Sequence, residues 1–106
     1  MKQEENQMMM EIYFSKEKAL EHKLSIKKIY QAIDEFFEER NVKKIGEGVY
    51  LTTEKNAGAF ILASAKFPKT SWFLKIIDQW YWREEGISLE DRIDCLKEYY
   101  EVQALS

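Results

Sequence analysis

The sequence predicts a single α+β domain, and three observations on its 106 residues lead to this class. Some stretches alternate their large side chains with the period of two that is typical of strands, whereas others repeat apolar residues with the period of a helix. The length allows one domain with a core of its own. The composition is 45% hydrophobic and 33% charged, with 4 glycines and 1 proline, which is typical of a globular chain.

Residues 1–7 are polar throughout, and we expect them to be a leader that precedes one domain at residues 8–106. Residues 8–15 alternate two sets of side chains, Met8, Met10, Ile12 and Phe14 against Met9, Glu11, Tyr13 and Ser15. This period of two predicts the first strand. Because methionine favours helices over strands, a helix at residues 8–15 is the open alternative.

Residues 26–41 have the clearest helical pattern. Ser25 is a good N-cap and Asn41 a candidate C-cap. The charged residues 16–23 form either a short helix of their own or the beginning of this one. The apolar residues of the pattern fall on one face at helical spacing, namely Ile26, Ile29, Tyr30, Ile33, Phe36 and Phe37.

Residues 42–67 predict a hairpin whose turn lies at residues 54–58. Ile45, Val49 and Leu51 share one side of the first arm. Gly46 and Gly48 lead into a strand and not into a helix N-terminus, so they indicate a bend and not a phosphate-binding loop. The second arm alternates Ala59, Ile61, Ala63, Ala65 and Phe67 on one face.

Residues 70–85 contain all three tryptophans and predict a helix that begins at Thr70 or Ser71. Its inward face consists of residues at i, i+3, i+4 and i+7, namely Phe73, Ile76, Ile77 and Trp80. Three consecutive aromatic residues at 80–82 span about 200° of such a helix, which is more than one core contact covers. Either a following helix covers the far side or an aromatic ridge is left for another molecule.

The following helix is predicted to begin at Ser88 and to fold back antiparallel against the tryptophan helix. The complete expected order is strand, helix, strand, strand, helix, helix. A first strand that is joined to the next through a helix would be parallel to it. We therefore expect a small mixed three-stranded sheet with helices packed mainly on one face.

The charge and the single cysteine limit the function classes. The net charge of −3 gives no general attraction to nucleic acids or anionic membranes. No segment resembles a signal peptide or a membrane span, so we expect a cytoplasmic protein. His22 and Cys95 have no patterned partners, so the sequence predicts no enzyme, no metal and no cofactor.

The sequence therefore predicts a small non-enzymatic interaction or regulatory module that uses the tryptophan helix. Trp and Tyr are enriched at interface hot spots, and an acidic chain suits a basic partner. The partner is another protein or a second copy of this chain in a homodimer. The candidate binding residues are Trp72, Lys75, Tyr81, Trp82 and Arg83.

A nucleic-acid-binding module is the alternative hypothesis. Residues 66–83 interleave lysine and arginine with tryptophan and tyrosine, as stacking platforms for single strands do. Locally the cations outnumber the single acid Asp78, whereas the remainder of the chain is acidic. No zinc, helix-turn-helix or glycine-rich RNA-binding signature is present.

Overall fold

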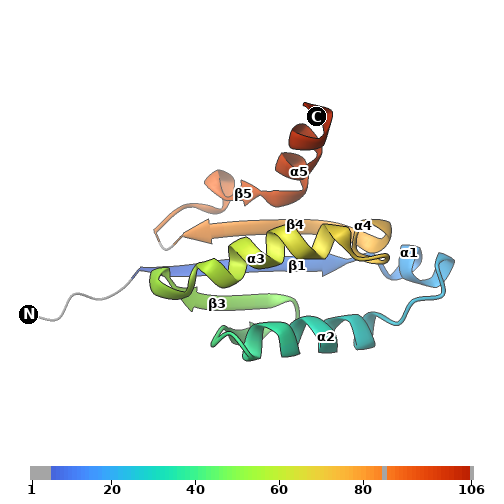
Figure 1. Ribbon diagram of the computed structural model, residues 1–106, viewed down its shortest axis with the longest axis horizontal. Helices are drawn as coiled ribbons and strands as arrows, with labels where there is room; N and C mark the ends of the chain where they lie inside the picture. The colour runs from blue at the N-terminus through green and yellow to red at the C-terminus, as the bar shows by residue number, and fades with distance from the viewer. Residues whose placement is uncertain (1–5, 85, 106) are drawn as a thin grey trace, which may run out of the picture.

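In the computed structural model, which describes residues 6–84 and 86–105, five strands form one antiparallel sheet (Figure 1). Their order in space is β2-β3-β1-β4-β5, so the first strand of the chain lies at the centre. The α+β class is confirmed, whereas the predicted three-stranded mixed sheet is wrong. The strands span Gln7–Phe14 (β1), Lys43–Gly46 (β2), Val49–Thr53 (β3), Ile77–Glu84 (β4) and Ile93–Asp94 (β5).

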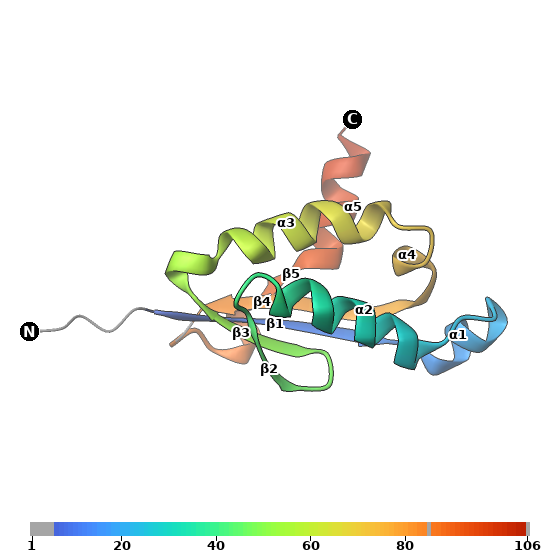
Figure 2. The same ribbon diagram turned by 60° about the horizontal axis from the view of Figure 1, so that its bottom comes forward.

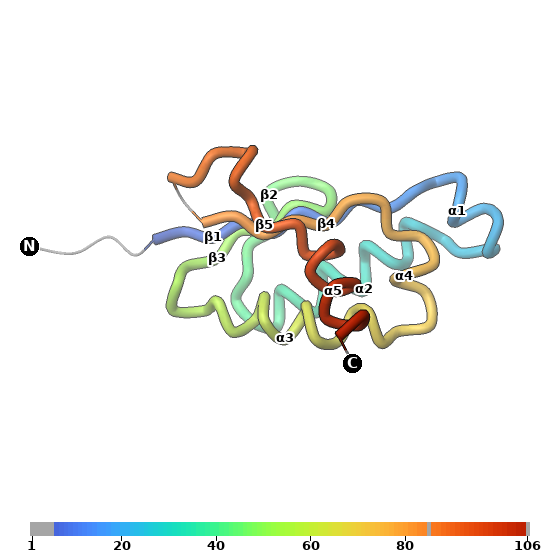
Figure 3. The backbone as a smooth tube through the Cα atoms, turned by 90° about the horizontal axis from the view of Figure 1, so that it is seen from above, coloured from blue at the N-terminus to red at the C-terminus, as the bar shows by residue number. Residues whose placement is uncertain are grey.

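The helices cover only one face of this sheet. Helices α2 to α5 all lie on the same side, and α1 extends from the end of β1 (Figures 2 and 3). Residues 86–92, which include a 3₁₀ turn at residues 89–91, bend toward the other side (Figure 3). The helices span Lys16–Glu21 (α1), Ile26–Glu38 (α2), Gly58–Lys66 (α3), Phe73–Ile76 (α4) and Cys95–Ala104 (α5).

Strand β1 provides the middle of the core. Every second side chain is buried beneath the helices, in the order Met8, Met10, Ile12 and Phe14. The predicted strand at residues 8–15 is thus confirmed, and its helical alternative is wrong. The expected leader falls mostly on residues 1–5, outside the described residues, but Gln7 already belongs to β1.

Helix α2 confirms the clearest helical pattern of the sequence. Ser25 caps it as predicted, because its Oγ accepts a hydrogen bond of 3.3 Å from the Lys28 N–H. The helix ends at Glu38, slightly before the predicted cap, and Asn41 then adopts a left-handed φ of 61°. Buried on its inner face are Ile29, Tyr30, Ile33 and Phe37.

The predicted hairpin is wrong in its second half. The predicted turn at residues 54–58 is wrong, because residues 54–56 form a 3₁₀ turn that leads into a helix. The hairpin turn lies instead at residues 46–49 and joins β2 to β3, where Gly48 has a φ of +75°. Residues 58–66 form helix α3 instead of a strand. Ala59, Phe60 and Ala63 are the buried residues of α3, so the apparent alternation was a consequence of alanine, which is the best helix former, at odd positions.

The predicted tryptophan helix is also wrong. The helix ends after one turn at Ile76, and the chain continues as strand β4. The same four residues nevertheless point inward: Phe73, Ile76, Ile77 and Trp80 are all buried. A register shift in the β1–β4 pairing, where Tyr13 faces Gln79 and Phe14 faces Ile77, keeps positions 77 and 80 on one side.

The predicted last helix begins seven residues later than expected. Residues 89–91 form a 3₁₀ turn, residues 93–94 form β5, and Asp94 caps α5 by accepting from the Lys97 N–H at 3.0 Å. Ser88, where the helix was predicted to begin, donates a hydrogen bond to the Asp91 carboxylate at 2.9 Å without starting an α-helix. The antiparallel helix pair is therefore absent from the described residues.

Parallel pairing of the first strands is likewise wrong. After α2 the chain enters the sheet at its edge as β2, turns, and places β3 antiparallel to β1. Each of the pairings among the described strands is antiparallel. None of the described helices combines the length and the apolar character needed to cross a membrane.

Candidate functional site

The predicted binding residues do not share one surface, and two of them lie at the end of the molecule formed by α4. Trp72 precedes α4 and is half-buried, with its ring centroid 6.2 Å from that of Phe14. Lys75 is exposed on α4 itself. Trp72 thus packs mainly against the core, and of these two residues Lys75 is the exposed one.

The other three residues lie on β4 and point to both faces of the sheet. Tyr81 and Arg83 pair with Glu11 and Met9 of β1 on the face that no described helix covers. Trp82 points to the helix side, with its ring centroid 5.6 Å from that of Phe60 on α3. The predicted aromatic ridge is therefore split by the pleat of the strand.

Trp82 lies in a cleft between α3 and α5, which we call the α3–α5 cleft. Helix α5 projects from the edge of the sheet and forms one wall, and α3 forms the other (Figures 1 and 3). The cleft encloses about 340 Å³. Its lining residues are Ile61, Ser64, Trp80, Trp82, Ile93, Cys95, Glu98, Tyr99 and Val102.

The walls of this cleft expose apolar side chains to solvent. Ile61 on α3 is 61% exposed, Val102 on α5 is 63% exposed, and Ile93 on β5 is 44% exposed. Trp82 is half-buried between them and Trp80 is fully buried. Apolar side chains grouped around a cleft are typical of a binding surface, whereas isolated ones are not informative.

The electrostatics of the cleft are weakly acidic. Glu98 is the single charged residue among those that line it. Cys95 lies buried at its base, and burial, together with the carboxylates of Glu98 and Asp94, raises the pKa of the Cys95 thiol to about 12. Since the thiolate is the reactive form of cysteine, Cys95 is an inert packing group at neutral pH.

The opposite side of the sheet forms a second surface, which we call the open face. Arg92 lies across it, with its guanidinium 3.5 Å from the centroid of the Tyr81 ring. The same Arg92 donates to the Glu11 carboxylate at 3.0 Å. Strands β1, β3 and β4 contribute the half-buried side chains of this face, Met9, Glu11, Tyr13, Val49, Leu51, Tyr81 and Arg83.

The two residues considered for catalysis lie in unremarkable settings. His22 is exposed at the end of α1, and Cys95 is the buried thiol described above. Among the described residues there is no group of three or more histidine, cysteine or acidic side chains that could hold a metal ion.

Sequence reasoning found Trp82 but missed Ile61, Ile93 and Val102. Ile61 was placed on one face of a predicted strand, together with Ala59 and Ala63. A helical reading of residues 58–66 would have placed Ile61 away from Ala59, Phe60 and Ala63, which are the buried residues of α3. The helical spacing of these buried residues was thus the signal in the sequence, and it was missed because residues 59–67 were interpreted as a strand.

Comparison with protein-family models, with curated proteins and with solved structures gives no match for this chain. A proposal for its function therefore has to start from the two surfaces described above.

Proposed function

We propose that this chain is a non-enzymatic interaction module that binds an amphipathic helix of a partner protein in the α3–α5 cleft. The observation that supports this most strongly is the grouping of exposed Ile61, Ile93 and Val102 around the half-buried ring of Trp82. A helix laid into an apolar groove inserts side chains at i, i+3 or i+4, and i+7. Tryptophan and tyrosine are also the residues most often found at interface hot spots.

The charge around the cleft favours a basic partner. Glu98 lines the cleft and Glu101 lies one turn further along α5, exposed. Ser64 provides a neutral polar group on the opposite wall. A partner helix with lysine or arginine beside its apolar stripe would complement these carboxylates, and such complementarity favours specificity and fast association.

The test is a titration of the ¹⁵N-labelled chain with a designed helical peptide of about 20 residues, long enough to be helical. The peptide has a leucine stripe flanked by lysine, and a second peptide has glutamate in place of lysine. We expect the basic peptide to shift the amide signals of Ile61, Tyr99 and Val102 and the indole signal of Trp82. Shifts confined to other regions, or none, would contradict the proposal.

Ile61→Asn is the variant for this experiment, because its side chain is exposed and its loss should not unfold the chain. Affinity for the basic peptide should fall by about tenfold, since burying one apolar side chain contributes about 1.5 kcal/mol or more. Leu20→Asn on α1 is the matched control, because Leu20 is equally apolar and 79% exposed but does not line the cleft. Equal loss in both variants would argue against binding in the cleft.

A second copy of this chain is the competing occupant of the cleft. Light scattering after size exclusion, over a concentration series, separates the two cases. A dimer that Ile61→Asn dissociates and Leu20→Asn does not would mean that the cleft is used for self-association. A monomer throughout leaves the cleft free for a partner helix.

The nucleic-acid alternative has less geometric support. Lys66 lies at the end of α3 and Lys69 in the following 3₁₀ turn, whereas Tyr81 and Arg83 lie on the open face. These cations and rings do not form the continuous platform on which consecutive bases stack. Titration with a single-stranded oligonucleotide checks this alternative directly.

A further inference from the structure

The alternation of strand β1 places three consecutive methionines in two different environments. Met8 and Met10 are buried in the core beneath the helices. Met9 lies between them in the sequence, points to the open face and is half-buried. A close-packed core shields a thioether from dissolved molecules. Among the methionines that the structure describes, Met9 is therefore the one that a dissolved reagent can reach in the folded chain.

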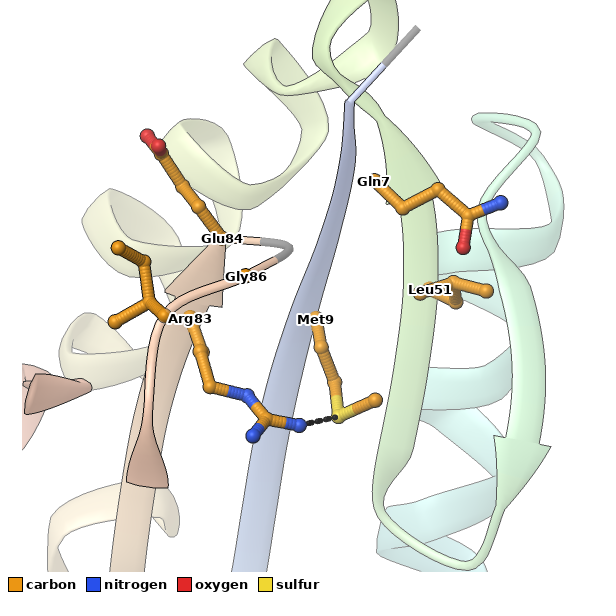
Figure 4. A pocket seen from close by; sticks show the side chains of 7 residues that line it. Gln7, Met9, Leu51, Arg83, Glu84 and Gly86 are labelled. Carbon is orange, nitrogen blue, oxygen red and sulfur yellow. Dashed lines mark hydrogen bonds between the residues drawn. The ribbon is translucent and has the colours of Figure 1, made fainter. Parts of the chain in front are cut away.

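A shallow pocket gives access to the Met9 side chain (Figure 4). Leu51, Arg83 and Ile87 line it together with Met9, and it encloses about 210 Å³. This volume is below the roughly 300 Å³ at which sites for small organic ligands begin, whereas one water occupies about 30 Å³ in the liquid. The pocket is thus suited to molecules of the size of water or hydrogen peroxide.

The guanidinium of Arg83 reaches across β1 to Met9. Its Nη2 lies 3.6 Å from the Met9 sulfur, and Figure 4 shows the Glu84 side chain pointing away from it. Within the described part of the chain Arg83 forms no ion pair. Thioether sulfur is a weak acceptor, so a strong donor is matched here with a weak acceptor. One oxygen atom added to this sulfur would give the guanidinium a polar acceptor.

From this we infer that Met9 is a modification site, which hydrogen peroxide oxidises to the sulfoxide and at which Arg83 binds the oxidised form. A lone pair of the sulfur forms a bond to one peroxide oxygen while the O–O bond breaks. The sulfur is oxidised by two electrons and the peroxide is reduced. The second oxygen leaves as hydroxide and takes the proton of the transferred oxygen, so the products are one sulfoxide and one water. The guanidinium then donates a charge-assisted hydrogen bond to the sulfoxide oxygen.

The position of Arg83 also predicts the configuration at the sulfur. Oxidation at one or the other lone pair gives two sulfoxide epimers, and each is reduced by a different methionine sulfoxide reductase. Because the guanidinium lies against one side of the Met9 sulfur, we expect the peroxide to approach from the other side. One epimer should therefore predominate in the folded chain, whereas a freely exposed methionine gives both.

Oxidation of Met9 would change the open face and spare the core. Oxidation of a buried methionine disrupts packing. Here the new polar group lies on the open face, between Leu51 of β3 and Arg83 of β4, which pair with Met9 on either side. The oxidised chain should therefore stay folded, and a reductase can restore the apolar side chain. This inference does not depend on helix binding in the α3–α5 cleft, because the cleft lies on the other side of the sheet.

The test is a time course of oxidation by dilute hydrogen peroxide, read by mass spectrometry with fragmentation that locates the oxygen among residues 8–10. In the folded chain Met9 should react at least about tenfold faster than Met8 and Met10, which are exposed by unfolding. In concentrated urea the three rates should become equal. Each of the two stereospecific reductases is then applied to the oxidised folded chain, and one of them should reduce most of the sulfoxide.

Arg83→Ala is the variant for this experiment, and Lys43→Ala is the matched control. Lys43 is an exposed cation that pairs with Leu51, one strand further from Met9. Arg83→Ala should leave Met9 reactive but should yield both epimers, whereas Lys43→Ala should keep the preference of the wild-type chain. Equal oxidation of the three methionines in the folded chain would overturn the inference. So would selective oxidation of Met9 that gives both epimers in equal amounts, or an epimer preference that Arg83→Ala does not change.

Discussion

At the scale of single residues, buried tyrosines connect the helix layer to the sheet. Tyr50 on β3 donates a 2.6 Å hydrogen bond to the Asp34 carboxylate on α2, and Lys44 donates to the other oxygen of that carboxylate at 2.8 Å. Tyr30 on α2 donates to the backbone oxygen of Ile12 at 3.0 Å. A phenol in such a position is bound in its protonated form, which links stability to alkaline pH.

Alkaline solution should therefore destabilise this fold through Tyr50. Burial, followed by the hydrogen bond to Asp34, raises the pKa of Tyr50 well above its ordinary value of 10.0. The stabilisation is complete below pH 10 and is lost as the pH rises above it, by at most about 1.4 kcal/mol per pH unit. Urea unfolding between pH 7 and pH 11 measures this slope.

Tyr50→Phe should reduce that slope and should cost about 1.5 to 3 kcal/mol at pH 7, because one hydrogen bond to a carboxylate is lost. Part of the slope should remain, because the pKa values of Tyr30 and Cys95 are also raised in the folded chain. Tyr100→Phe on α5 is the control, since Tyr100 is 52% exposed, and it should leave the curve unchanged. An alkaline slope of wild-type steepness in Tyr50→Phe would show that other groups cause it.

At the scale of elements, the β2–β3 turn depends on one glycine. Gly48 has a φ of +75°, which residues with a Cβ rarely adopt. A Cβ at this position would collide with the backbone oxygen of Ile12 and would lie 3.1 Å from the ring of Tyr30. The turn thus brings the backbone of the hairpin directly against the central strand.

Gly48→Ala should consequently destabilise the chain by about 2 kcal/mol or more, through backbone strain and displacement of β1. Gly58→Ala is the matched control. It lies at the beginning of α3 with no atom within 4 Å of the added Cβ, and it should be neutral or stabilising by up to about 1 kcal/mol. Chemical denaturation of both variants checks the difference. If the two variants had equal free energies of unfolding, the turn would accommodate a Cβ at position 48 without loss of stability, and the prediction would be wrong.

The elements also explain how far sequence reasoning could reach. The regular patterns of β1 and α2 were sufficient to identify both, since their periods of 2 and 3.6 are undisturbed. In a regular strand, residues on one face are two positions apart. The register shift in β4 instead places Ile77 and Trp80, which are three positions apart, on the same face, and this spacing resembles that of a helix. The inward residues were therefore predicted correctly, and the element that contains them was not.

The candidate binding site was predicted incorrectly for the same reason, because residues 77–84 were interpreted as a helix. Once residues 77–84 are a strand, Tyr81 and Trp82 must point to opposite faces, so a single aromatic ridge cannot exist. Trp82 still lies in the α3–α5 cleft, but its neighbours there come from α3, β5 and α5. Local periodicity does not give the order of the strands in the sheet, so the composition of the open face could not be predicted.

At the scale of the whole molecule, β5 and α5 form a small unit attached to the edge of the sheet. Within the described residues, strand β5 pairs with β4 through two residue pairs, at Tyr81 and Trp82. Arg92 reinforces this attachment from the open face through Glu11 and the ring of Tyr81. The α3–α5 cleft and the open face therefore meet at β4, and we expect the integrity of the cleft to depend on a contact made on the other side of the sheet.

Removal of that contact should open the cleft without unfolding the sheet. At pH 8 a thiol with a pKa of about 12 is ionised on the order of one part in 10,000, so Cys95 reacts mainly when α5 detaches. Arg92→Ala should accelerate labelling of Cys95 by a thiol reagent several-fold or more, with a much smaller change in global unfolding. Mass spectrometry of the labelling time course measures the rate.

Arg40→Ala is the matched control for the Cys95 labelling experiment. Arg40 is also a half-buried arginine over an aromatic ring, 3.9 Å from the centroid of Phe36, but it lies on the helix side away from β5. It should leave the labelling of Cys95 close to the wild-type rate. If both variants accelerate labelling only in proportion to their loss of global stability, α5 does not open by itself. In that case the cleft is a fixed part of the domain.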